Sequence, residues 1–564
     1  MESVGAYLWS LMTRQLLCCL VFWAAGLGAA QSLLWGQEPT PVIPPPETSP
    51  NTSATKITEK PVAFTPLDRA QQLYLGGQFD EAVQEYNSII RDGQDAAAAY
   101  AGMARAYLKL KKPDDAYAAA SKAVELDPFL ATAHSALGEV YFRQGQLYDA
   151  QTQFLLPFKT GKGDARSYLG LERLYRASFN FKRAKFAIDK AYELEPRDPD
   201  ISGDWLGTRP PPERVKAMEA LVASPSGFYS RAEVANTKHR LAVLKDQIEH
   251  QERTCRLAKQ PESSELTLVP VDIDKRPNPF LGLQVDVNGQ KSRLVVDTSA
   301  KGIVIDEDIA QKGGVQQIVR TDMDGLGQES PPESYVGFAN SIKIGNLEFE
   351  NCYLTVVERA APGSFYNRFR GTIGARFFDE YLVDLDMPSA KLRLEPLPKR
   401  PATEDRGSAQ MSADDPSTTE FHDRFVAPEM SAWTQLYQFG ESIAIPTVVN
   451  ESPPELFEVD TSGYTNEIAI EFAKKWAGFR GTTSPRIYSI DGKVDTRWSG
   501  GVRLRFAGFY FDSMAEPSFD MKIVTDRLGT EIYGALGFEV LHNLRTTIDY
   551  RDGLIHFDTG QERH

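Results

Sequence analysis

This chain has few residues of the kinds that hold metal ions or crosslink proteins. Only four of its 564 residues are cysteine and seven are histidine, and they do not lie at the spacing of a zinc site. No glycine-rich loop with a phosphate-binding pattern occurs either. Acidic residues outnumber basic ones, so the net charge is −15 and the chain lacks the electrostatic footprint of a nucleic-acid binder. We therefore expect no metal, no other cofactor and no nucleic-acid partner.

Long apolar runs are also scarce, and the clearest one lies at the N-terminus. Arg14 precedes the run LLCCLVFWAAGLGAA, which is short for a membrane span of about 20 residues. The run ends in small residues, Gly28, Ala29 and Ala30, which a signal peptidase prefers. We predict that residues 1–30 are a signal peptide and that the protein is exported, either periplasmic or secreted. Membrane association is expected only if this segment is retained.

Two cysteines remain outside that run, Cys255 and Cys352. One pair in an exported protein can form a disulfide. Nothing in the sequence, however, brings the helical linker that holds Cys255 next to the strand that holds Cys352. We expect free thiols.

The composition is that of a globular protein, with 42% hydrophobic and 25% charged residues. A chain of this length predicts about three domains. Residues 31–65 are rich in proline, serine and threonine and have no helical or strand periodicity, which is typical of a disordered tether.

Residues 66–200 show a helical pattern that repeats every 34 residues. Tyr107, Tyr141 and Tyr175 keep this spacing, and the same period relates four alanines, Ala82, Ala116, Ala150 and Ala184. Small residues allow paired helices to approach, and aromatic residues fill the groove between them. This pattern resembles four copies of the tetratricopeptide repeat. The resemblance implies an α-solenoid whose concave surface binds a protein partner.

Residues 201–262 are predicted to form a helical spacer that docks the solenoid against the region that follows. Near Leu266 the periodicity changes to the alternation of β-strands, which continues to about residue 397. A polar linker at 398–432 separates this region from a second strand-rich region at 433–560.

The two strand-rich regions carry the same landmarks at an offset of 163 residues. The first contains RLVVDTSAKGIVI, with Asp297, Thr298 and Ser299, and the second contains ELFEVDTSGYTNEI, with Asp460, Thr461 and Ser462. The offset also carries Gly374 onto Gly537 and Asp386 onto Asp549. A carboxylate at the end of an apolar strand must be paired, hydrogen-bonded or neutralised. Two such carboxylates in matching contexts indicate a duplicated domain.

Each copy resembles one lobe of a retropepsin-like aspartic protease. In that family an Asp-Thr-Gly loop follows a strand, and an apolar-apolar-Gly element crosses behind it. Thr372, Ile373 and Gly374 match this element in the first copy, and Ala535, Leu536 and Gly537 match it in the second. The resemblance implies a multidomain α plus all-β protein, in which the solenoid precedes two β-barrel lobes that form a pseudo-twofold bilobal unit.

The resemblance also implies a mechanism and a set of site residues. Asp297 and Asp460 would be the catalytic dyad, sharing one proton and activating a water that attacks a peptide bond. Thr298 and Thr461 would make reciprocal hydrogen bonds beneath the dyad. Ser299 and Ser462 stand where the family has glycine, so the loop either tolerates a Cβ at negative φ or is pushed outward. The implied substrate is a protein or peptide.

Two segments are candidates for the mobile hairpin that closes over substrate in this family. One contains Gly325 and Gly327 and the other contains Gly492; an ordinary surface turn is the alternative for each. The sequence leaves two functions open. The first is an exported aspartic endopeptidase whose repeats bind protein, and the second is a catalytically inactive peptide-binding or scaffold protein that acts through the solenoid.

Overall fold

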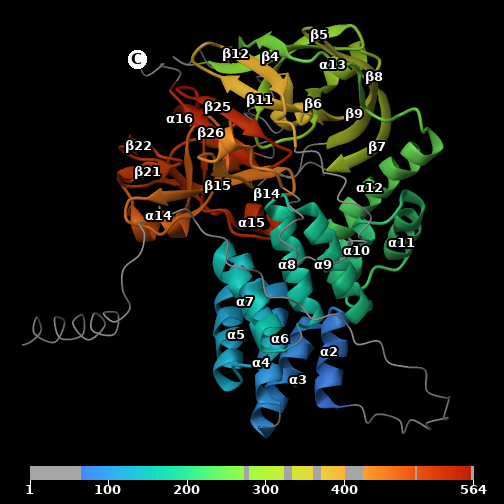
Figure 1. Cartoon of the computed structure of the whole chain (residues 1–564), viewed down its shortest axis with the longest axis vertical. Coiled ribbons are helices and arrows are strands. Elements are labelled where there is room, and N and C mark those ends of the chain that lie inside the picture. Colours follow the sequence, from blue (N-terminus) through green and yellow to red (C-terminus); the bar gives the residue numbers. More distant parts are fainter. Residues whose placement is uncertain are drawn as a thin grey trace, which may run out of the picture. The chain divides into compact units, whose positions relative to one another are not determined.

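The computed structural model describes residues 65–93, 95–161, 163–271, 279–322, 333–359, 370–400, 424–489 and 492–559 (Figure 1). The predicted signal peptide, all but the last residue of the predicted tether, the candidate hairpin with Gly325 and Gly327, and most of the predicted linker lie outside the described residues. No helix within the described ranges is both long enough and apolar enough to cross a bilayer.

The N-terminal part of the described chain consists of paired helices. The pairs are α2 (Pro66–Leu75) with α3 (Phe79–Asp92), α4 (Ala96–Lys109) with α5 (Pro113–Leu126), α6 (Ala131–Arg143) with α7 (Leu147–Thr160), and α8 (Ala165–Ala177) with α9 (Phe181–Leu194). The four alanines that share the 34-residue period are buried in the second helix of each pair. These residues allow close helix packing, as the period predicts.

Aromatic rings of the second helices pack directly onto glycines of the first helices. A Cβ on Gly102 of α4 would lie 2.3 Å from the ring of Tyr86, and one on Gly170 of α8 would lie 2.2 Å from the ring of Phe154. Such distances are well inside van der Waals contact, so each ring occupies the space that a side chain would need. This interlocking explains why glycine occurs within these helices despite its low helix propensity.

Three further helices follow the pairs: α10 (Pro199–Gly207), α11 (Pro211–Ala223) and α12 (Arg231–Glu249). Ser230 begins α12 with a capping box, in which its hydroxyl accepts from the Glu233 amide and the Glu233 carboxylate accepts from the Ser230 amide. α12 contacts the β region that follows, since the Tyr353 hydroxyl donates to Asp246 at 2.5 Å.

The end of the predicted helical spacer is a strand, not a helix. β1 (Arg256–Lys259) pairs antiparallel with β9 (Leu347–Arg359), with Arg256 opposite Glu350. The free edge of β9 offers unpaired backbone groups, and the chain leaving α12 satisfies them. This pairing brings Cys255 and Cys352 together in a disulfide. The expectation of free thiols is therefore wrong, because it assumed that Cys255 lies in a helix.

The first β region (residues 263–397) forms a nine-stranded sheet with β1. Its path runs β1-β9-β6-β10-β5-β4-β8-β7, and β3 pairs with β4. The other strands of this sheet are β3 (Val269–Val271), β4 (Phe280–Val287), β5 (Gln290–Asp297), β6 (Ile303–Asp306), β7 (Gln316–Asp322), β8 (Glu333–Ile344) and β10 (Gly371–Gly374). Short helices α13 (Glu307–Lys312) and η2 (Ala375–Phe378) follow β6 and β10.

The second β region (residues 433–560) contains another nine-stranded sheet. Its path runs β20-β23-β17-β24-β16-β15-β21-β22, and β14 pairs with β15. These strands are β14 (Tyr437–Phe439), β15 (Ser442–Val449), β16 (Glu455–Val459), β17 (Glu467–Ala469), β20 (Thr496–Trp498), β21 (Val502–Phe506), β22 (Phe509–Ser513), β23 (Pro517–Phe519) and β24 (Gly534–Leu536). Its helices are α14 (Ile470–Trp476), α15 (Lys522–Leu528) and α16 (Phe538–Leu541).

The central pairings of the two sheets have the same register. In the first, β5 and β10 are parallel, with Val295 opposite Thr372. In the second, β16 and β24 are parallel, with Glu458 opposite Ala535. Adding 163 to either residue of the first pair gives its counterpart in the second. The internal repeat of the sequence is therefore a repeat of strand pairing.

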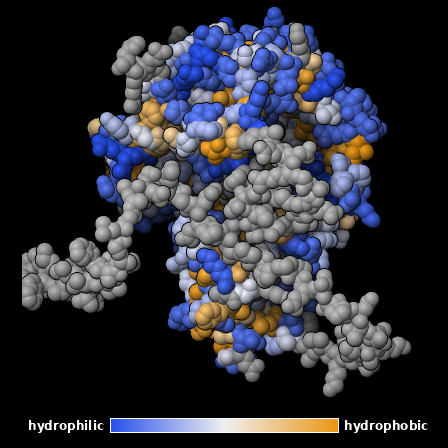
Figure 2. Space-filling view, in the orientation of Figure 1, coloured by the Kyte–Doolittle hydropathy of each residue, from blue (hydrophilic) through white to orange (hydrophobic). Residues whose placement is uncertain are grey.

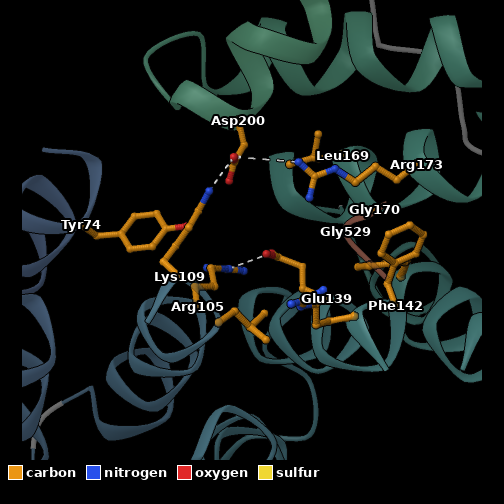
Figure 3. A pocket seen from close by; sticks show the side chains of 13 residues that line it. Tyr74, Arg105, Lys109, Glu139, Phe142, Leu169, Gly170, Arg173, Asp200 and Gly529 are labelled. Carbon is orange, nitrogen blue, oxygen red and sulfur yellow. Dashed lines mark hydrogen bonds and ion pairs between the residues drawn. The ribbon is translucent and has the colours of Figure 1, made fainter. Parts of the chain in front are cut away.

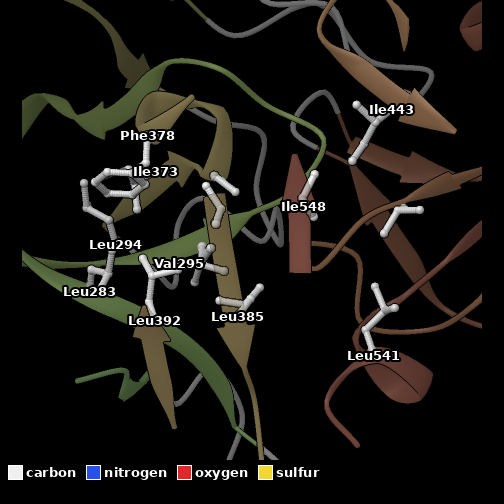
Figure 4. Packing of buried hydrophobic residues seen from close by; sticks show 14 of the residues in the cluster. Leu283, Leu294, Val295, Ile373, Phe378, Leu385, Leu392, Ile443, Leu541 and Ile548 are labelled. Carbon is white, nitrogen blue, oxygen red and sulfur yellow. The ribbon is translucent and has the colours of Figure 1, made fainter. Parts of the chain in front are cut away.

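A six-stranded sheet joins the two β regions. Its order is β13-β26-β25-β11-β12-β2, formed by β2 (Ser264–Thr267), β11 (Tyr381–Asp386), β12 (Lys391–Pro396), β13 (Thr434–Gln435), β25 (Arg545–Asp549) and β26 (Leu554–Asp558). β11 of the first region pairs antiparallel with β25 of the second. Buried residues of both regions, among them Leu385 and Ile548, belong to one continuous hydrophobic core (Figure 4). The described surface visible in Figure 2 is mostly hydrophilic over these regions.

The solenoid contacts the second β region through the turn between α6 and α7. The Arg143 guanidinium donates to the Thr525 carbonyl at 2.5 Å and pairs with Asp526. The Tyr533 hydroxyl donates to the Gln144 carbonyl at 3.0 Å. Tyr533 directly precedes β24, so this contact lies next to the element that carries Gly537.

The disulfide gives a first prediction. Replacing Cys255 by serine removes a crosslink between residues 97 positions apart, which we expect to lower the free energy of unfolding by about 2–5 kcal/mol. Denaturant unfolding without reductant measures this difference. Reductant should lower the stability of the wild type to that of the variant and leave the variant unchanged; equal stability of the two proteins without reductant would contradict the crosslink.

Candidate functional site

The two aspartates, Asp297 and Asp460, lie at the ends of strands β5 and β16. Asp297 is the last residue of β5, and Asp460 directly follows β16. The preceding residues are buried, including Val296 and Val459 at 1% and 0% exposure, because both strands lie inside a sheet. Each aspartate is thus carried by a buried strand to the point where the strand ends.

The loop after each aspartate is closed by the same turn. The Ser299 amide and hydroxyl donate to Asp297 Oδ1 at 2.8 and 2.9 Å. The Ser462 amide and hydroxyl donate to Asp460 Oδ1 at 2.8 and 2.7 Å. Neither serine adopts a positive φ. The first of the two alternatives raised by the serines therefore describes the structure, since a Cβ is accommodated at negative φ.

Thr298 and Thr461 join the two loops through four hydrogen bonds. The Thr298 amide donates to Thr461 Oγ1 and the Thr461 amide donates to Thr298 Oγ1, both at 3.1 Å. Each hydroxyl also donates to a carbonyl of the opposite strand, Thr298 to Val459 and Thr461 to Val296, both at 2.7 Å. Both threonines are buried, at 0% and 2% exposure. These bonds hold the loop Asp297–Ser299 against the loop Asp460–Ser462. We call this junction of the two loops the seam.

The two glycines lie where each loop crosses its later strand. Gly374 is opposite Asp297 in the β5–β10 pairing, and a Cβ there would lie 2.2 Å from the Ala300 carbonyl oxygen. A Cβ on Gly537 would lie 2.1 Å from the Thr465 carbonyl oxygen. Backbone occupies the space of the missing side chain at both positions, so any other residue would displace the loop.

The electrostatics of the seam favour bound protons. Burial, followed by the negative charge of Asp460, raises the pKa of Asp297 to about 7, against the opposing hydrogen bonds from Ser299. Burial and Asp460 likewise raise the pKa of Glu458, on β16, to about 7. Burial raises the pKa of Glu467 to about 8, and the charges of Asp460 and Glu458 add to the effect. Crowded carboxyl groups cannot all ionise, so burial and mutual repulsion favour bound protons at the seam.

Three residues at the seam escaped the sequence reasoning. The Tyr550 hydroxyl, 4% exposed as a residue, donates to the Thr298 carbonyl at 3.3 Å. Gly463 lies against Asp460, since a Cβ there would be 2.9 Å from Asp460 Oδ2. Glu458 lies in the repeated segment, but its counterpart in the first copy is Val295. Of these three residues, only Gly463 could have been found from the sequence, because it directly follows the Asp-Thr-Ser motif of the second copy.

The second candidate hairpin is present as a hairpin. β18 (Ile487–Ser489) pairs antiparallel with β19 (Gly492–Val494), with Ser489 opposite Gly492. Gly492 has a φ of 113°, a conformation that favours glycine. Among the described residues, no hydrogen bond joins this hairpin to Asp297 or Asp460, and its closure over the seam stays a prediction. Within the same residues, no group of three or more His, Cys, Asp or Glu side chains is arranged to hold a metal ion.

Two family models match parts of the two kinds of domain. A family model described as aspartyl protease matches residues 283–377, and one described as tetratricopeptide repeat matches residues 97–129. A protein SGT1 homolog from Oryza sativa subsp. japonica is 30% identical over 98 residues, which are 17% of this chain and 27% of that protein. A thermophilic TPR protein from Thermus thermophilus is 21% identical, with a TM-score of 0.24, over 32% of this chain and 97% of that one. The chain thus carries a tetratricopeptide repeat and an aspartyl-protease-type domain.

The threonine pair yields the second prediction. Thr298→Val or Thr461→Val keeps the volume of the side chain but removes a hydroxyl, which leaves a buried amide and a buried carbonyl unpaired. Each unpaired group costs about 1–3 kcal/mol, so we expect each variant, with two such groups, to lower the free energy of unfolding by about 2–6 kcal/mol. Denaturant unfolding monitored by tryptophan fluorescence measures this change.

Thr447→Val is the matched control for both variants. Thr447 of β15 is as deeply buried, at 0% exposure, but its hydroxyl has no hydrogen-bond partner within the described structure. We expect this substitution to leave stability unchanged or to raise it. A loss in Thr447→Val as large as the loss in Thr298→Val would show that the reciprocal bonds carry no special stability.

The raised pKa of Asp297 predicts how stability depends on pH. The folded state holds a proton that the unfolded chain releases near pH 4, so this contribution is fully present below pH 4 and is lost as pH rises through about 7. Asp297→Asn removes the buried charge. We expect the variant to exceed the wild type in unfolding free energy above pH 7, by as much as about 4 kcal/mol, with the difference shrinking toward pH 4.

Asp386→Asn is the comparison variant, because we expect it to lower the free energy of unfolding at pH 7 where Asp297→Asn raises it. Burial acts to raise the pKa of Asp386, but hydrogen bonds from Ser389 and Arg393 hold it below its usual value. Its contribution is present above the unfolded pKa and lost in acid, so this variant should be less stable than the wild type at pH 7. When unfolding is measured from pH 4 to pH 8, the deficit of Asp386→Asn should stay constant, because this group titrates below pH 4, whereas the difference between Asp297→Asn and the wild type should grow with pH. Parallel curves for Asp297→Asn and the wild type would contradict the prediction for Asp297.

Proposed function

We propose that the protein is an exported aspartic endopeptidase that hydrolyses peptide bonds through an Asp297/Asp460 dyad. The two β regions act as two retropepsin-like lobes related by a pseudo-twofold axis. One observation carries the proposal: the four hydrogen bonds between Thr298 and Thr461 bring two identical Asp-Thr-Ser loops, from segments 163 residues apart, to one seam. A structural turn would not need this reciprocal arrangement.

The chemistry uses one proton shared by the pair. The pair holds one proton between them; in the attack step Asp297, whose pKa is raised by burial and by Asp460, carries it and Asp460 takes a proton from a water molecule. The resulting hydroxide attacks the carbonyl carbon of the peptide bond while Asp297 donates its proton to the developing oxyanion. Asp460 then gives the proton that it took from water to the amide nitrogen, the C–N bond breaks, and Asp297 takes back a proton from the hydroxyl of the intermediate as the carboxylic acid forms, so the pair again holds one proton. The two carboxyl groups titrate as a unit, so activity should follow macroscopic pKa values of the pair.

Export is supported by the disulfide between Cys255 and Cys352. Such a bond persists in oxidising compartments and is rare where thiols are kept reduced. The N-terminal apolar segment agrees with a periplasmic or secreted location. The tetratricopeptide repeats bind a protein partner in this proposal, either to recruit substrate or to anchor the enzyme in an assembly.

A second function, an inactive peptide-binding protein, is favoured by the serine hydroxyls. Ser299 and Ser462 each place two donors on Oδ1 of their aspartate. A donor on this oxygen stabilises the charged form and opposes proton sharing. Both functions would use the same site, and they differ in whether Asp297 and Asp460 catalyse cleavage of the bound peptide.

Peptide cleavage by the purified mature chain separates these functions. We expect the wild type to cleave an unbiased library of fluorogenic peptides between pH 4 and pH 7. Asp297→Asn and Asp460→Asn should each lower kcat/KM by at least about 100-fold, since each removes a group that transfers a proton. The products should carry ordinary carboxyl and amino ends, which mass spectrometry can verify.

Asp512→Asn is the matched control, because Asp512 forms an exposed ion pair with Arg503 on the β21–β22 hairpin. Its activity should equal that of the wild type. Cleavage that survives in either dyad variant would exclude the proposed mechanism. A folded wild type without cleavage at any pH would leave the peptide-binding alternative.

A further inference from the structure

The inner face of the solenoid is basic and is formed by the first helix of each pair. Lys109 and Arg105 come from α4, and Arg166 and Arg173 come from α8. A cavity of about 150 Å³ is lined by Tyr74 of α2, Arg105, Lys109, Arg173 and Glu139 of α6, and Figure 3 labels these side chains around it. Arg166 lies next to this cavity, since its guanidinium donates to the Tyr74 hydroxyl at 3.2 Å. In a stack of helical repeats this is the face that receives an extended partner.

Carboxylates from outside the repeats occupy this face. Asp200 of α10 binds Lys109 Nζ at 2.8 Å and Arg166 Nη1 at 3.0 Å. Asp198, which caps α10, binds Arg166 Nη2 at 2.5 Å. Figure 3 shows Asp200 reaching Lys109 and, on the other side, Arg173. A single short segment thus supplies acids to helices from the second and the fourth repeat.

An aromatic anchor from the same part of the chain holds the first repeat. The ring of Phe228 lies edge-on to Tyr74, with centroids 5.7 Å apart, and Lys109 Nζ lies 4.1 Å from its centre. The Tyr229 hydroxyl donates to the Pro199 carbonyl at 3.0 Å, which ties this anchor to α10. The backbone also crosses the first repeat closely, since a Cβ on Gly77 would lie 2.0 Å from the Gly227 carbonyl carbon.

The middle of the segment Asp198–Tyr229 is less buried than its ends. α11 contributes no buried residue, whereas Ile201 of α10 and Phe228 are 0% and 4% exposed. α11 can therefore detach first, and release of the whole segment also requires Ile201 and Phe228 to leave their clusters. Elements with few buried contacts open at low free-energy cost. Once the segment opens, Arg166, whose side chain is 8% exposed, loses the Asp198 and Asp200 carboxylates and keeps the longer contact with Glu139 at 3.5 Å. A buried cation with part of its compensation removed favours a new carboxylate partner.

We propose that the segment Asp198–Tyr229 is an intramolecular occupant of the solenoid's partner site, and that the site takes an acidic segment of a protein partner. The partner segment carries closely spaced carboxylates, like those of Asp198 and Asp200, beside an aromatic anchor. The inference rests on the proposed role of the repeats in protein binding. The partner competes with the chain's own segment, so its apparent affinity is reduced by the fraction of molecules in which the groove is open.

The probe is a fluorescently labelled synthetic peptide with the sequence of residues 197–206, RDPDISGDWL. Its binding to the full mature chain is measured by anisotropy in an Asp297→Asn background, so that cleavage does not interfere and the result is independent of catalysis. Phe228→Ala removes one anchor and should tighten binding by at least about tenfold, because it raises the open fraction. Tyr229→Phe, which removes a single hydroxyl, should act in the same direction with a smaller effect.

Two controls define specificity. Phe129→Ala removes an aromatic ring that is 75% exposed and should not change the affinity. A peptide with asparagine in place of its three aspartates should bind at least about tenfold more weakly, and added salt should weaken the acidic peptide as it screens the charges.

Hydrogen exchange supplies the second readout. Peptide binding should speed exchange of residues 211–229, since these residues leave the groove with the segment. Equal affinity of the wild type and both anchor variants would overturn the proposal. So would binding that leaves the exchange of residues 211–229 unchanged, or the absence of binding to folded Tyr229→Phe.

Discussion

The reciprocal hydrogen bonds of Thr298 and Thr461 are the constraint on which the seam depends. Each hydroxyl accepts an amide and donates to a carbonyl of the opposite strand, so an amide, a hydroxyl and a carbonyl on each side are satisfied only in this arrangement. A shift of either loop would leave several of them unpaired in a dry interior, which is costly. The threonines therefore fix where the aspartates lie, and the aspartates remain free to exchange protons. The threonines thus position the loops, and the neighbouring aspartates carry the protons.

The region of the seam is stabilised by contacts with two other parts of the protein, the six-stranded sheet and the solenoid. The six-stranded sheet pairs β11 with β25, which continues the core of the first β region into the second. Tyr550, two residues from this pairing, reaches back to the Thr298 carbonyl. On the other side, Tyr533 contacts the α6–α7 turn of the solenoid and leads into β24, whose Leu536 carbonyl accepts from the Asp460 amide. The solenoid is thereby connected to the Asp460 loop through one short strand.

Periodicity made both kinds of domain visible in the sequence. A spacing of 34 residues predicted paired helices, and an offset of 163 predicted a repeated β unit with its Asp-Thr-Ser loops. Structural features that are not repeated along the chain could not be recognised from periodicity. β1 forms because β9 leaves an edge open, and the Cys255–Cys352 disulfide follows from that pairing. The contacts of Tyr550 with Thr298 and of Asp200 with Lys109 likewise join residues that are remote in sequence and unrelated in type. Long-range pairing of this kind is decided by tertiary packing, which a single sequence does not display.

The serines that replace the family's glycine belong to a wider network. The Ser299 hydroxyl donates its one proton to Asp297, and its oxygen lies within hydrogen-bonding reach of the Glu458 carboxyl. Glu458 in turn lies beside Asp460, whose charge raises its pKa. A neutral Glu458 can donate a hydrogen bond where a carboxylate would repel. The serine thus links Asp297 to a third acid whose pKa is raised by burial and by Asp460, so bound protons are favoured where these carboxyl groups converge. The Cβ at this position is accommodated because neither serine adopts a positive φ, and the bond from the hydroxyl to Asp297 is the feature that opposes proton sharing.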